Sequence, residues 1–482
     1  MGDRLPSCTR GGNKLASLRV PRIGSINMKP SRRKFIKNIG SLAVLSGVST
    51  VAKPFNIIRD LSVSPNDKIR LATIGMGIQG HYDTKAALKT AGVEFVAAAD
   101  LYTGRLDRVR QTFGNDMVVT RDYREILSRK DIDAVIIATP DHWHDKITID
   151  ALNAGKNVYC EKPMVQAINE GKPVIDAWKK SGKTMQVGSQ RISGSVFQEA
   201  KRIIAAGDIG AINYVESNSD RFSAIGAWNY SIPTDASPAT VDWDAFLKDT
   251  AKMPFDANRF FRWRNYKNYG TGVAGDLFVH LITGVHYVVD SKGPNRIFAS
   301  GGLRYWKEGR DVPDVMVAIL DYPKAATHEE FQMVLRVNFA NAGTINNNTR
   351  IIGTEGQIDF SGNGLTLSKK KLPKAPGFGN YDSYFTFSDA QQKEFAKEYN
   401  ARFTEADRKT EPIKEVKFTP EPGSDEHANH FGNFFENIRK GSQATIEDPI
   451  FGFRAAAPVL ACNESYFQKK AISWDPVNMR KL

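Results

Sequence analysis

Three side chains of this sequence have the types and spacing for moving a proton at a carbon that exchanges a hydride. Asp276 and His280 lie four residues apart in Gly275–Ile282, whose apolar residues fit a helix packed on a core. Residues i and i+4 share a helix face, and a carboxylate beside an imidazole orients the ring and raises its basicity. Lys162 stands just past an apolar strand, where an ammonium could stabilise a developing alkoxide. Together they predict a general base and its support, against the alternatives of a helical ion pair and a surface lysine.

A glycine-rich loop predicts a phosphate-binding turn. Residues 68–74 read as a buried strand, and 81–91 read as a helix. The loop between them consists of Gly75, Met76, Gly77, Ile78, Gln79 and Gly80. Gly75 permits a tight turn, Gly77 lets the backbone approach a pyrophosphate, and Gly80 lets helix and strand pack closely. The free N–H groups at the helix start would face the phosphates of a dinucleotide.

The acidic residue after the next strand favours one nucleotide. Residues 93–100 form a second predicted strand that ends at Asp100, twenty residues after Gly80. A carboxylate at this spacing can accept hydrogen bonds from a ribose 2′-hydroxyl and repels a 2′-phosphate. We therefore expect NAD as the cofactor, with NADP less favoured, although Arg105 and Arg108 stand nearby.

The alternation of strands and helices continues to about residue 190. Strands are predicted at 133–139, 157–160 and 184–187, with helices at 147–154 and 172–180. This order predicts a doubly wound parallel sheet, a Rossmann fold of the α/β class. Two segments follow carboxyl ends of strands, where such sheets bind ligands: Thr139-Pro140-Asp141-His142-Trp143-His144 and Glu161-Lys162-Pro163.

The second half reads differently. Strands are predicted at 213–217, 296–300, 315–322, 333–339, 349–352 and 357–360, with helices at 430–438 and 453–466 and a basic loop at 369–376. The pattern predicts an α+β domain with a large, mostly antiparallel sheet. Cys160 and Cys462 are more easily read as two buried thiols than as a disulfide.

Together, the glycine loop, the Thr139–His144 segment and Glu161-Lys162-Pro163 resemble the Gfo/Idh/MocA oxidoreductases, the family of glucose–fructose oxidoreductase and inositol dehydrogenase. The resemblance extends from about Lys68 to the C-terminus. It implies that Lys162 lies between nicotinamide and substrate, often before a cis proline, and that His144 lies near the nicotinamide. It further implies that Lys162, Asp276 and His280 are catalytic, that the C-terminal sheet joins subunits into a homo-oligomer, and that Thr139, Pro140, His144, Glu161 and Lys162 contact the cofactor.

Aromatic and arginine residues between these motifs suggest a carbohydrate. Arg191 follows the last strand of the first half, and Trp263 and Arg264 precede the Asp276 helix. Aromatic faces stack on the C–H faces of sugar rings and arginine donates to their hydroxyls, so these three are candidate substrate-binding residues. Most aromatics are nonetheless packing residues. The histidines show no metal-site spacing, and no metal is expected.

The net charge of +13 does not indicate a nucleic-acid partner. Residues 1–52 hold ten of the 66 Lys and Arg and one of the 53 Asp and Glu, so the excess lies in the leader rather than on a folded face. In that leader, Arg32 and Arg33 precede Phe35 and a mildly apolar run. This plan resembles the twin-arginine (Tat) export signal, which implies a periplasmic protein and the Tat export machinery as a partner.

We therefore divide the chain into four segments: an export leader at 1–52, a linker at 53–65, an NAD-binding domain at 66–190 and a substrate and oligomerisation domain at 191–482. Within the leader, the true start of translation is expected at Met28. The leading function is an exported NAD-dependent oxidoreductase that acts on a sugar or glycoside with a tightly bound cofactor. An NAD-dependent glycoside hydrolase that works by oxidation and elimination needs the same site. A non-catalytic exported sugar-binding protein is the third possibility.

Overall fold

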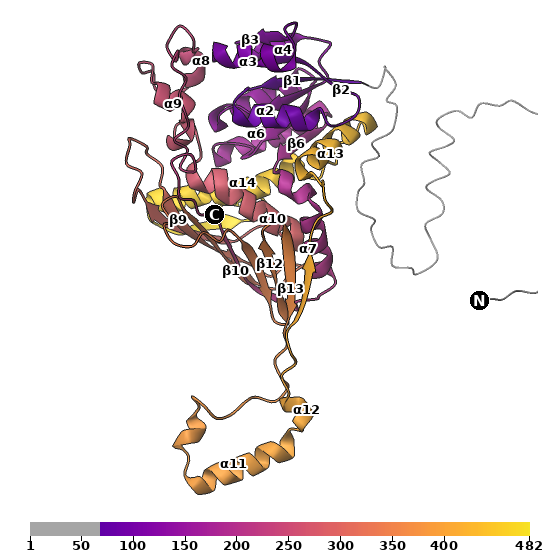
Figure 1. The fold of residues 1–482 in the computed structure, drawn as a ribbon, viewed down its shortest axis with the longest axis vertical. Helices are drawn as coiled ribbons and strands as arrows, with labels where there is room; N and C mark the ends of the chain where they lie inside the picture. Colours follow the sequence, from indigo (N-terminus) through magenta and orange to yellow (C-terminus); the bar gives the residue numbers. More distant parts are fainter. Residues whose placement is uncertain (1–67) are drawn as a thin grey trace, which may run out of the picture. The chain divides into compact units, whose positions relative to one another are not determined.

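The computed structural model describes residues 68–482 (Figure 1). The leader and linker, with Arg32 and Arg33, lie outside the described residues. In the part that is described, no helix combines the length and apolar character needed to span a bilayer.

The glycine loop belongs to a six-stranded parallel sheet with the order β3-β2-β1-β4-β5-β6. Its strands are β1 (Ile69–Ile74), β2 (Val93–Ala99), β3 (Val118–Thr120), β4 (Ala134–Ile137), β5 (Asn157–Glu161) and β6 (Met185–Gly188). The central strand β4 is buried throughout, as expected when helices cover both faces of a parallel sheet. The strand order reverses between β1 and β4, which is the point where such sheets bind ligands.

Both faces of this sheet are covered, partly by helices from the far end of the chain. Its own helices are α2 (Ile78–Ala87), α3 (Thr103–Phe113), α4 (Tyr123–Ser128), α5 (His144–Asn153) and α6 (Ile168–Ser181). Leu71 of β1 packs in one core cluster with Phe431 and Phe434 of α13 (Glu426–Lys440). Ile74 points into the other cluster, which includes Phe453 of α14 (Pro449–Gln468). The two sheets therefore share helices, while the domain boundary at residue 190 stays a prediction.

A second, ten-stranded sheet follows the order β14-β13-β12-β11-β7-β10-β9-β8-β15-β16. Its strands are β7 (Ile212–Asn218), β8 (Arg296–Gly302), β9 (Val315–Tyr322), β10 (Phe331–Asn338), β11 (Thr349–Gly353), β12 (Gly356–Ser361), β13 (Gly364–Lys369), β14 (Lys414–Phe418), β15 (Ile472–Asp475) and β16 (Arg480–Lys481). Apart from the parallel pair β7–β10, its pairings are antiparallel. The predicted fold class, a Rossmann sheet plus a mostly antiparallel sheet, is confirmed.

The buried face of this sheet supports the helices that carry the candidate site. Residues alternate between buried and more exposed along β9 and β10, as in a sheet with one covered face. Contacts with that face come from the core residues of α7 (Ser195–Ala205), α10 (Val279–Val289) and α14. Cys160 and Cys462 are both free and buried in this shared core.

Residues 228–270 form a cap segment with an aromatic core of its own. It contains the short helices α8 (Trp243–Leu247) and α9 (Ala257–Phe261). The cap is joined to the parallel sheet by a bridge between Tyr102 and Val241 and by the Tyr102 hydroxyl, which donates to Asp235 at 2.6 Å. The sequence did not predict these helices, because each is only five residues long.

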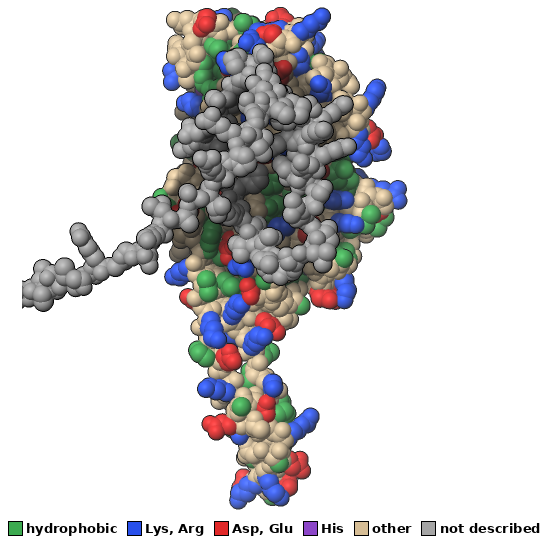
Figure 2. All heavy atoms as spheres, turned by 90° about the vertical axis from the view of Figure 1, so that its right-hand side faces the viewer, with side chains coloured by type: hydrophobic (Ala, Val, Ile, Leu, Met, Phe, Trp, Pro, Cys, Tyr) green, Lys and Arg blue, Asp and Glu red, His purple; other side chains and the backbone are tan. Residues whose placement is uncertain are grey.

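The chain leaves the second sheet between β13 and β14, and there it forms α11 (Asp389–Arg402) and α12 (Glu405–Arg408) (Figure 1). Neither helix has a buried residue. Figure 2 shows basic and acidic side chains interspersed along this part. The predicted basic loop at 369–376 is wrong at its first residue, because Lys369 still pairs with Gly356 in the sheet and forms an ion pair with Asp208.

A glycine contact between the two sheets' helices provides a test of this packing. A Cβ atom at Gly171 of α6 would lie 2.1 Å from the ring of Phe453 on α14. We expect Gly171→Ala to lower the free energy of unfolding by about 1–3 kcal/mol through overpacking, measured by urea denaturation. Gly377→Ala is the control, since a Cβ there meets nothing within 4 Å. Equal stability of the two variants would contradict the described packing.

Candidate active site

The glycine turn brings β1, β4 and α2 into close contact. Gly75 has φ +93°, and a Cβ there would lie 2.7 Å from the backbone of Ala138. A Cβ on Gly80 would lie 1.9 Å from the carbonyl oxygen of Gly75. A Cβ atom on Gly77 would lie 3.8 Å from its nearest neighbour, Cζ of Arg105, so the backbone there leaves room for a ligand. The turn therefore has the shape that a dinucleotide phosphate group needs.

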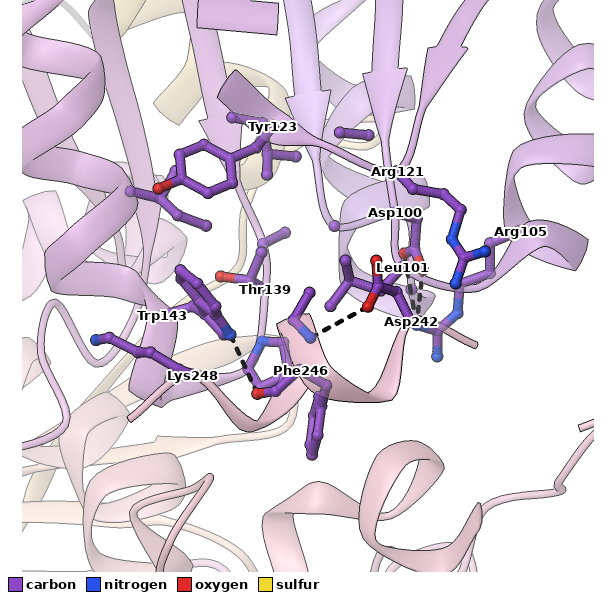
Figure 3. A pocket seen from close by; sticks show the side chains of 18 of the residues that line it. Asp100, Leu101, Arg105, Arg121, Tyr123, Thr139, Trp143, Asp242, Phe246 and Lys248 are labelled. Atoms are coloured by element: carbon purple, nitrogen blue, oxygen red, sulfur yellow. Dashed lines mark hydrogen bonds and ion pairs between the residues drawn. The ribbon is translucent and has the colours of Figure 1, made fainter. Parts of the chain in front are cut away.

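A cleft of about 680 Å³ lies between the carboxyl ends of the parallel strands and α8 of the cap (Figure 3). Of the sequence-predicted cofactor residues it is lined by Gly75, Gly77, Ile78, Gln79, Asp100, Thr139 and Pro140. Met76 and Gly80 are buried beside it rather than exposed to it. The cap closes over the cleft through Lys248, which donates to Asp145 at 2.9 Å. Phe246 adds a second contact, accepting a hydrogen bond from Trp143 at 3.3 Å.

Asp100 is held rigidly at the edge of this cleft. Its carboxylate accepts hydrogen bonds from the backbone N–H of Met76 at 2.7 Å and of Tyr102 at 2.9 Å. Arg105 lies 3.4 Å from the same carboxylate, and Figure 3 shows Arg105 and Arg121 on the same side of the cleft as Asp100. Fixed by its neighbours, Asp100 can present lone pairs to ribose hydroxyls.

Unsatisfied polar atoms in the cleft test whether a nucleotide fits. The hydroxyl of Thr139 and Nε of Arg121 are buried, and neither has a hydrogen-bond partner in the described structure. Both residues line the cleft. Buried polar atoms without partners are costly, and a bound polar ligand would satisfy them. With the room at Gly77 and the fixed Asp100, the residues present fit a dinucleotide.

A smaller cavity of about 240 Å³ adjoins the cleft. Gln79, Tyr230 and Arg264 line both, so they mark where the two meet. The smaller cavity brings together the predicted catalytic and substrate residues Lys162, Arg191, Arg264, Asp276 and His280, together with Glu161. The cleft thus adjoins a cavity that holds all three predicted catalytic side chains.

An ion cluster fixes the centre of the smaller cavity. The Lys162 ammonium lies 3.0 Å from Oδ1 of Asp276, and Nε of Arg264 lies 3.1 Å from the same oxygen. Burial alone would raise the pKa of Asp276, but the two cations outweigh burial and hold it well below its usual value. The Lys162–Pro163 peptide bond is cis, as the family resemblance implies.

The Asp276 carboxylate acts on His280 through its charge and raises the pKa of that imidazole, as expected, but the hydrogen bond that would orient the ring is not formed. No hydrogen bond joins these two described residues, and the Asp276 carboxylate is bound to Lys162 and Arg264 instead. The reason is a π-helical turn at Ala274–Phe278, whose wider i→i+5 spacing shifts Asp276 relative to α10. Burial and the charges of Lys162 and Arg191 hold the pKa of His280 well below its usual value. His280 is therefore a neutral imidazole that can accept a proton.

A buried carboxyl pair lies behind Lys162. Glu161 accepts a hydrogen bond from Gln190 at 2.5 Å, and Asp83 accepts one from His427 at 2.7 Å. The two carboxyl groups lie close enough for the charge of one to act on the other. Burial raises the pKa of Asp83 to about 8, and burial together with the charge of Asp83 raises that of Glu161 to about 8. At neutral pH the pair therefore retains a proton.

Two predicted site residues lie elsewhere than expected. His144 is 1% exposed and lines neither cavity, because its two ring nitrogens lie 2.7 Å from the carbonyl oxygen of Pro163 and 2.9 Å from that of Thr139. It holds the two strand-end loops together rather than facing the cleft. Trp263 lines the larger cleft and not the smaller cavity, and Arg264 packs over its ring at 4.2 Å.

Sequence reasoning missed several residues that line the site. The sequence patterns give no functional role to Trp143, Arg121, Tyr123 or Arg221, and Arg105 enters only as a complication for NAD. Arg121 and Tyr123 follow the three-residue strand β3, and placing them required recognising that strand. No local signal marks Arg221, which enters the small cavity from the loop after β7. In residues 68–482 no group of His, Cys, Asp or Glu is arranged to hold a metal ion.

Comparisons with known proteins agree with this geometry. Residues 69–189 match the family model described as "Oxidoreductase family, NAD-binding Rossmann fold", and residues 250–359 match the Gfo/Idh/MocA C-terminal domain. The first match identifies an NAD-binding Rossmann domain.

The chain is 34% identical over 144 residues to scyllo-inositol 2-dehydrogenase (NAD(+)) of Bacillus subtilis, which is 30% of this chain and 42% of that protein. It is 32% identical over 154 residues to a glycosyl hydrolase family 109 protein of Shewanella baltica, covering 30% and 34% of the two chains. The matches thus span less than half of these relatives.

Among solved structures, a levoglucosan dehydrogenase in complex with NADH and L-sorbose superposes with a TM-score of 0.61 at 20% identity, over 85% of this chain and 100% of that one. At this identity the likeness concerns the fold alone.

The buried carboxyl pair predicts how stability depends on pH. The folded pKa of about 8 lies above the value of about 4 expected in the unfolded chain, so the native state binds more protons between these values. Stability from the pair is complete below about pH 4 and is lost as the pH rises through about 8. We expect Asp83→Asn to show a shallower fall in melting temperature between pH 5 and 9 than the unmodified protein. An unchanged slope would contradict this, and the exposed Asp176→Asn serves as the control.

Proposed function

We propose that this Gfo/Idh/MocA family oxidoreductase transfers hydride between NAD, bound in the cleft, and a hydroxyl-bearing carbon of a sugar or glycoside, bound in the smaller cavity. The observation that carries the proposal is the junction at Gln79, Tyr230 and Arg264, where the cofactor cleft opens onto Lys162 and His280. The inositol and levoglucosan dehydrogenases, with which it shares sequence or fold, are named for polyhydroxylated substrates.

The cofactor would be held by the backbone at the start of α2 and by Asp100. The first N–H groups of α2 would serve the phosphates beside the space left open at Gly77, and Asp100 would offer its carboxylate to the ribose hydroxyls. When bound, NAD supplies the hydride acceptor. We favour NAD over NADP because Asp100 would repel a 2′-phosphate, although Arg105 and Arg121 nearby make this a proposal to be measured.

The proton would be handled by the residues around Asp276. Neutral His280 accepts the hydroxyl proton as the hydride leaves the same carbon. The Lys162 ammonium donates a hydrogen bond to the substrate oxygen and stabilises its developing negative charge. Asp276 does not touch the reacting atoms in this scheme. It holds Lys162 in position, helped by Arg264.

A glycoside hydrolase activity is the second candidate, favoured by the family 109 relative. Oxidation of a ring carbon, elimination of the aglycone and re-reduction would use the same cavity and the same His280 and Lys162. The two activities differ in their products. A third possibility, a non-catalytic sugar-binding protein, would not need Lys162 or His280.

The test begins with denaturing the purified protein and identifying the released nucleotide, which we expect to be NAD. The intact protein is then mixed with methyl and nitrophenyl glycosides, and the absorbance of reduced nicotinamide and the release of nitrophenol are followed. We expect reduction that falls by about 10²-fold or more in His280→Gln and Lys162→Met. Lys172→Met, exposed on α6, is the control.

The outcomes separate the three candidates. Reduction of nicotinamide with a keto sugar as product supports the dehydrogenase. Free nitrophenol without net oxidation supports the hydrolase. Full activity of a Lys162→Ala/His280→Ala double variant, or a protein that cannot take up any pyridine nucleotide, would refute both enzymatic candidates.

We further propose that the protein is exported by the Tat pathway to the periplasm with its cofactor already bound. Two features support this: the Arg32-Arg33 motif, and the cap, whose contacts at Lys248 and Tyr102 cover the cleft. Export of a folded protein would carry the nucleotide with it. Association of subunits through the ten-stranded sheet stays a prediction of the same kind.

Export can be tested by fractionation. We expect Arg32→Lys/Arg33→Lys to leave the full-length protein in the cytoplasm, although the charge of the leader is unchanged. Lys29→Arg, which follows Met28 and lies outside the motif, should be exported like the unmodified protein. Cell fractions are analysed by immunoblotting. Detection of the double variant in the periplasm would contradict export by the twin-arginine route.

A further inference from the structure

The charges around the smaller cavity do not balance. Four cationic side chains line it, namely Lys162, Arg191, Arg221 and Arg264. Two acidic residues face them, Asp276 and Glu161. Even with both carboxylates ionised, the four cations leave an excess of positive charge. A neutral sugar would leave this excess of positive charge uncompensated.

Two of the cations are free to bind a ligand. Lys162 and Arg264 are both engaged by Asp276, at 3.0 and 3.1 Å. Among the described residues, neither Arg191 nor Arg221 has a carboxylate within ion-pair distance. Arg221 donates a hydrogen bond to the carbonyl oxygen of Gly226 at 2.9 Å and packs over Phe339, which leaves most of its donors unused.

Arg191 and Arg221 approach the cavity from different parts of the chain. Arg191 belongs to the short helix after β6 and is exposed, whereas Arg221 follows β7 and is half-buried. Glu426 lies close enough to Arg191 to be influenced by it, but beyond ion-pair distance. The charges of both arginines reach His280 and contribute to its lowered pKa. Both guanidinium groups therefore lie near the proposed base.

We propose that the substrate is an anionic sugar, whose carboxylate or phosphate ester binds between Arg191 and Arg221. This rests on the proposed function and specifies the substrate class of the same cavity. The planar guanidinium group presents paired donors that match carboxylate and phosphate oxygens.

Binding of the anion also prepares the base. Positive charge around His280 disfavours its protonated form, so the empty cavity contains a weak base. A substrate anion between Arg191 and Arg221 offsets that charge and makes His280 a better proton acceptor. A neutral sugar lacks this effect, so the acidic substrate gains in both binding and turnover.

The experiment compares matched ligands on the full protein with its bound nucleotide. Methyl β-glucuronoside and methyl β-glucoside differ only at C6, and glucose 6-phosphate with glucose forms the second pair. Affinity is measured by isothermal titration calorimetry, and turnover by reduction of the nicotinamide. We expect at least tenfold tighter binding of one anionic sugar than of its neutral partner, and the pair that responds tells carboxylate from phosphate.

Variants connect the preference to the two arginines. Arg191→Gln and Arg221→Gln should each reduce the ratio of affinities for the anionic sugar and its neutral partner at least severalfold. Arg202→Gln, on the exposed side of α7 where it pairs with Glu199, should keep the full preference. Because the two arginines are substituted separately, one variant still tests the proposal if the other fails to fold.

The results separate this inference from the proposed function. Equal or better binding and turnover of the neutral sugars would overturn the inference and leave the oxidoreductase proposal standing. Tighter binding of an anion through Arg191 and Arg221 without any nicotinamide reduction would support the inference and refute the proposed activity. Absence of binding by all four sugars would overturn the inference.

Discussion

The site is organised around the buried carboxylate of Asp276 and its two cations. Asp276 lies in the π turn before α10, Lys162 follows β5, and Arg264 belongs to the cap, so one carboxylate joins three separate parts of the chain. Burying these charges is costly, and removing one partner of such a cluster typically costs about 3–5 kcal/mol because it strands the others. The ion cluster therefore determines the position of the Lys162 ammonium and the charge that surrounds the His280 imidazole.

The cofactor cleft and the smaller cavity differ in the charged groups that line them. Around the glycine turn, backbone N–H groups and one fixed carboxylate, Asp100, face an open cleft. Around Lys162, burial together with the charges of Lys162 and Arg191 lowers the pKa of His280, and burial together with the charge of Asp83 raises the pKa of Glu161 to about 8. Proton acceptor and proton donor states thus coexist within one small cavity, because each group's environment disfavours its charged form. No metal ion is needed in the described site to set these states.

The fold could be predicted from the sequence because each feature that indicates it depends on a few neighbouring residues. Gly75 needs positive φ, Gly80 needs the absence of a side chain, and β4 needs apolar residues on both faces, so all three can be read from a few neighbouring letters. The site depends on long-range geometry. The Asp276 carboxylate binds Lys162 and Arg264 rather than His280 because of a π turn, which the residue spacing does not reveal. His144 is buried because it contacts the carbonyl group of Pro163, nineteen residues away.

The cap has a kinetic consequence under the proposed function. Lys248 and Tyr102 latch it across the nucleotide cleft, so each protein molecule would work with one resident cofactor rather than exchanging it every cycle. Electrons taken from one sugar must then be handed to a second molecule that enters the same cavity, which at about 240 Å³ holds one ring at a time. Under the proposed function such an enzyme would follow double-displacement kinetics, with an oxidant that fits the same cavity as the reductant.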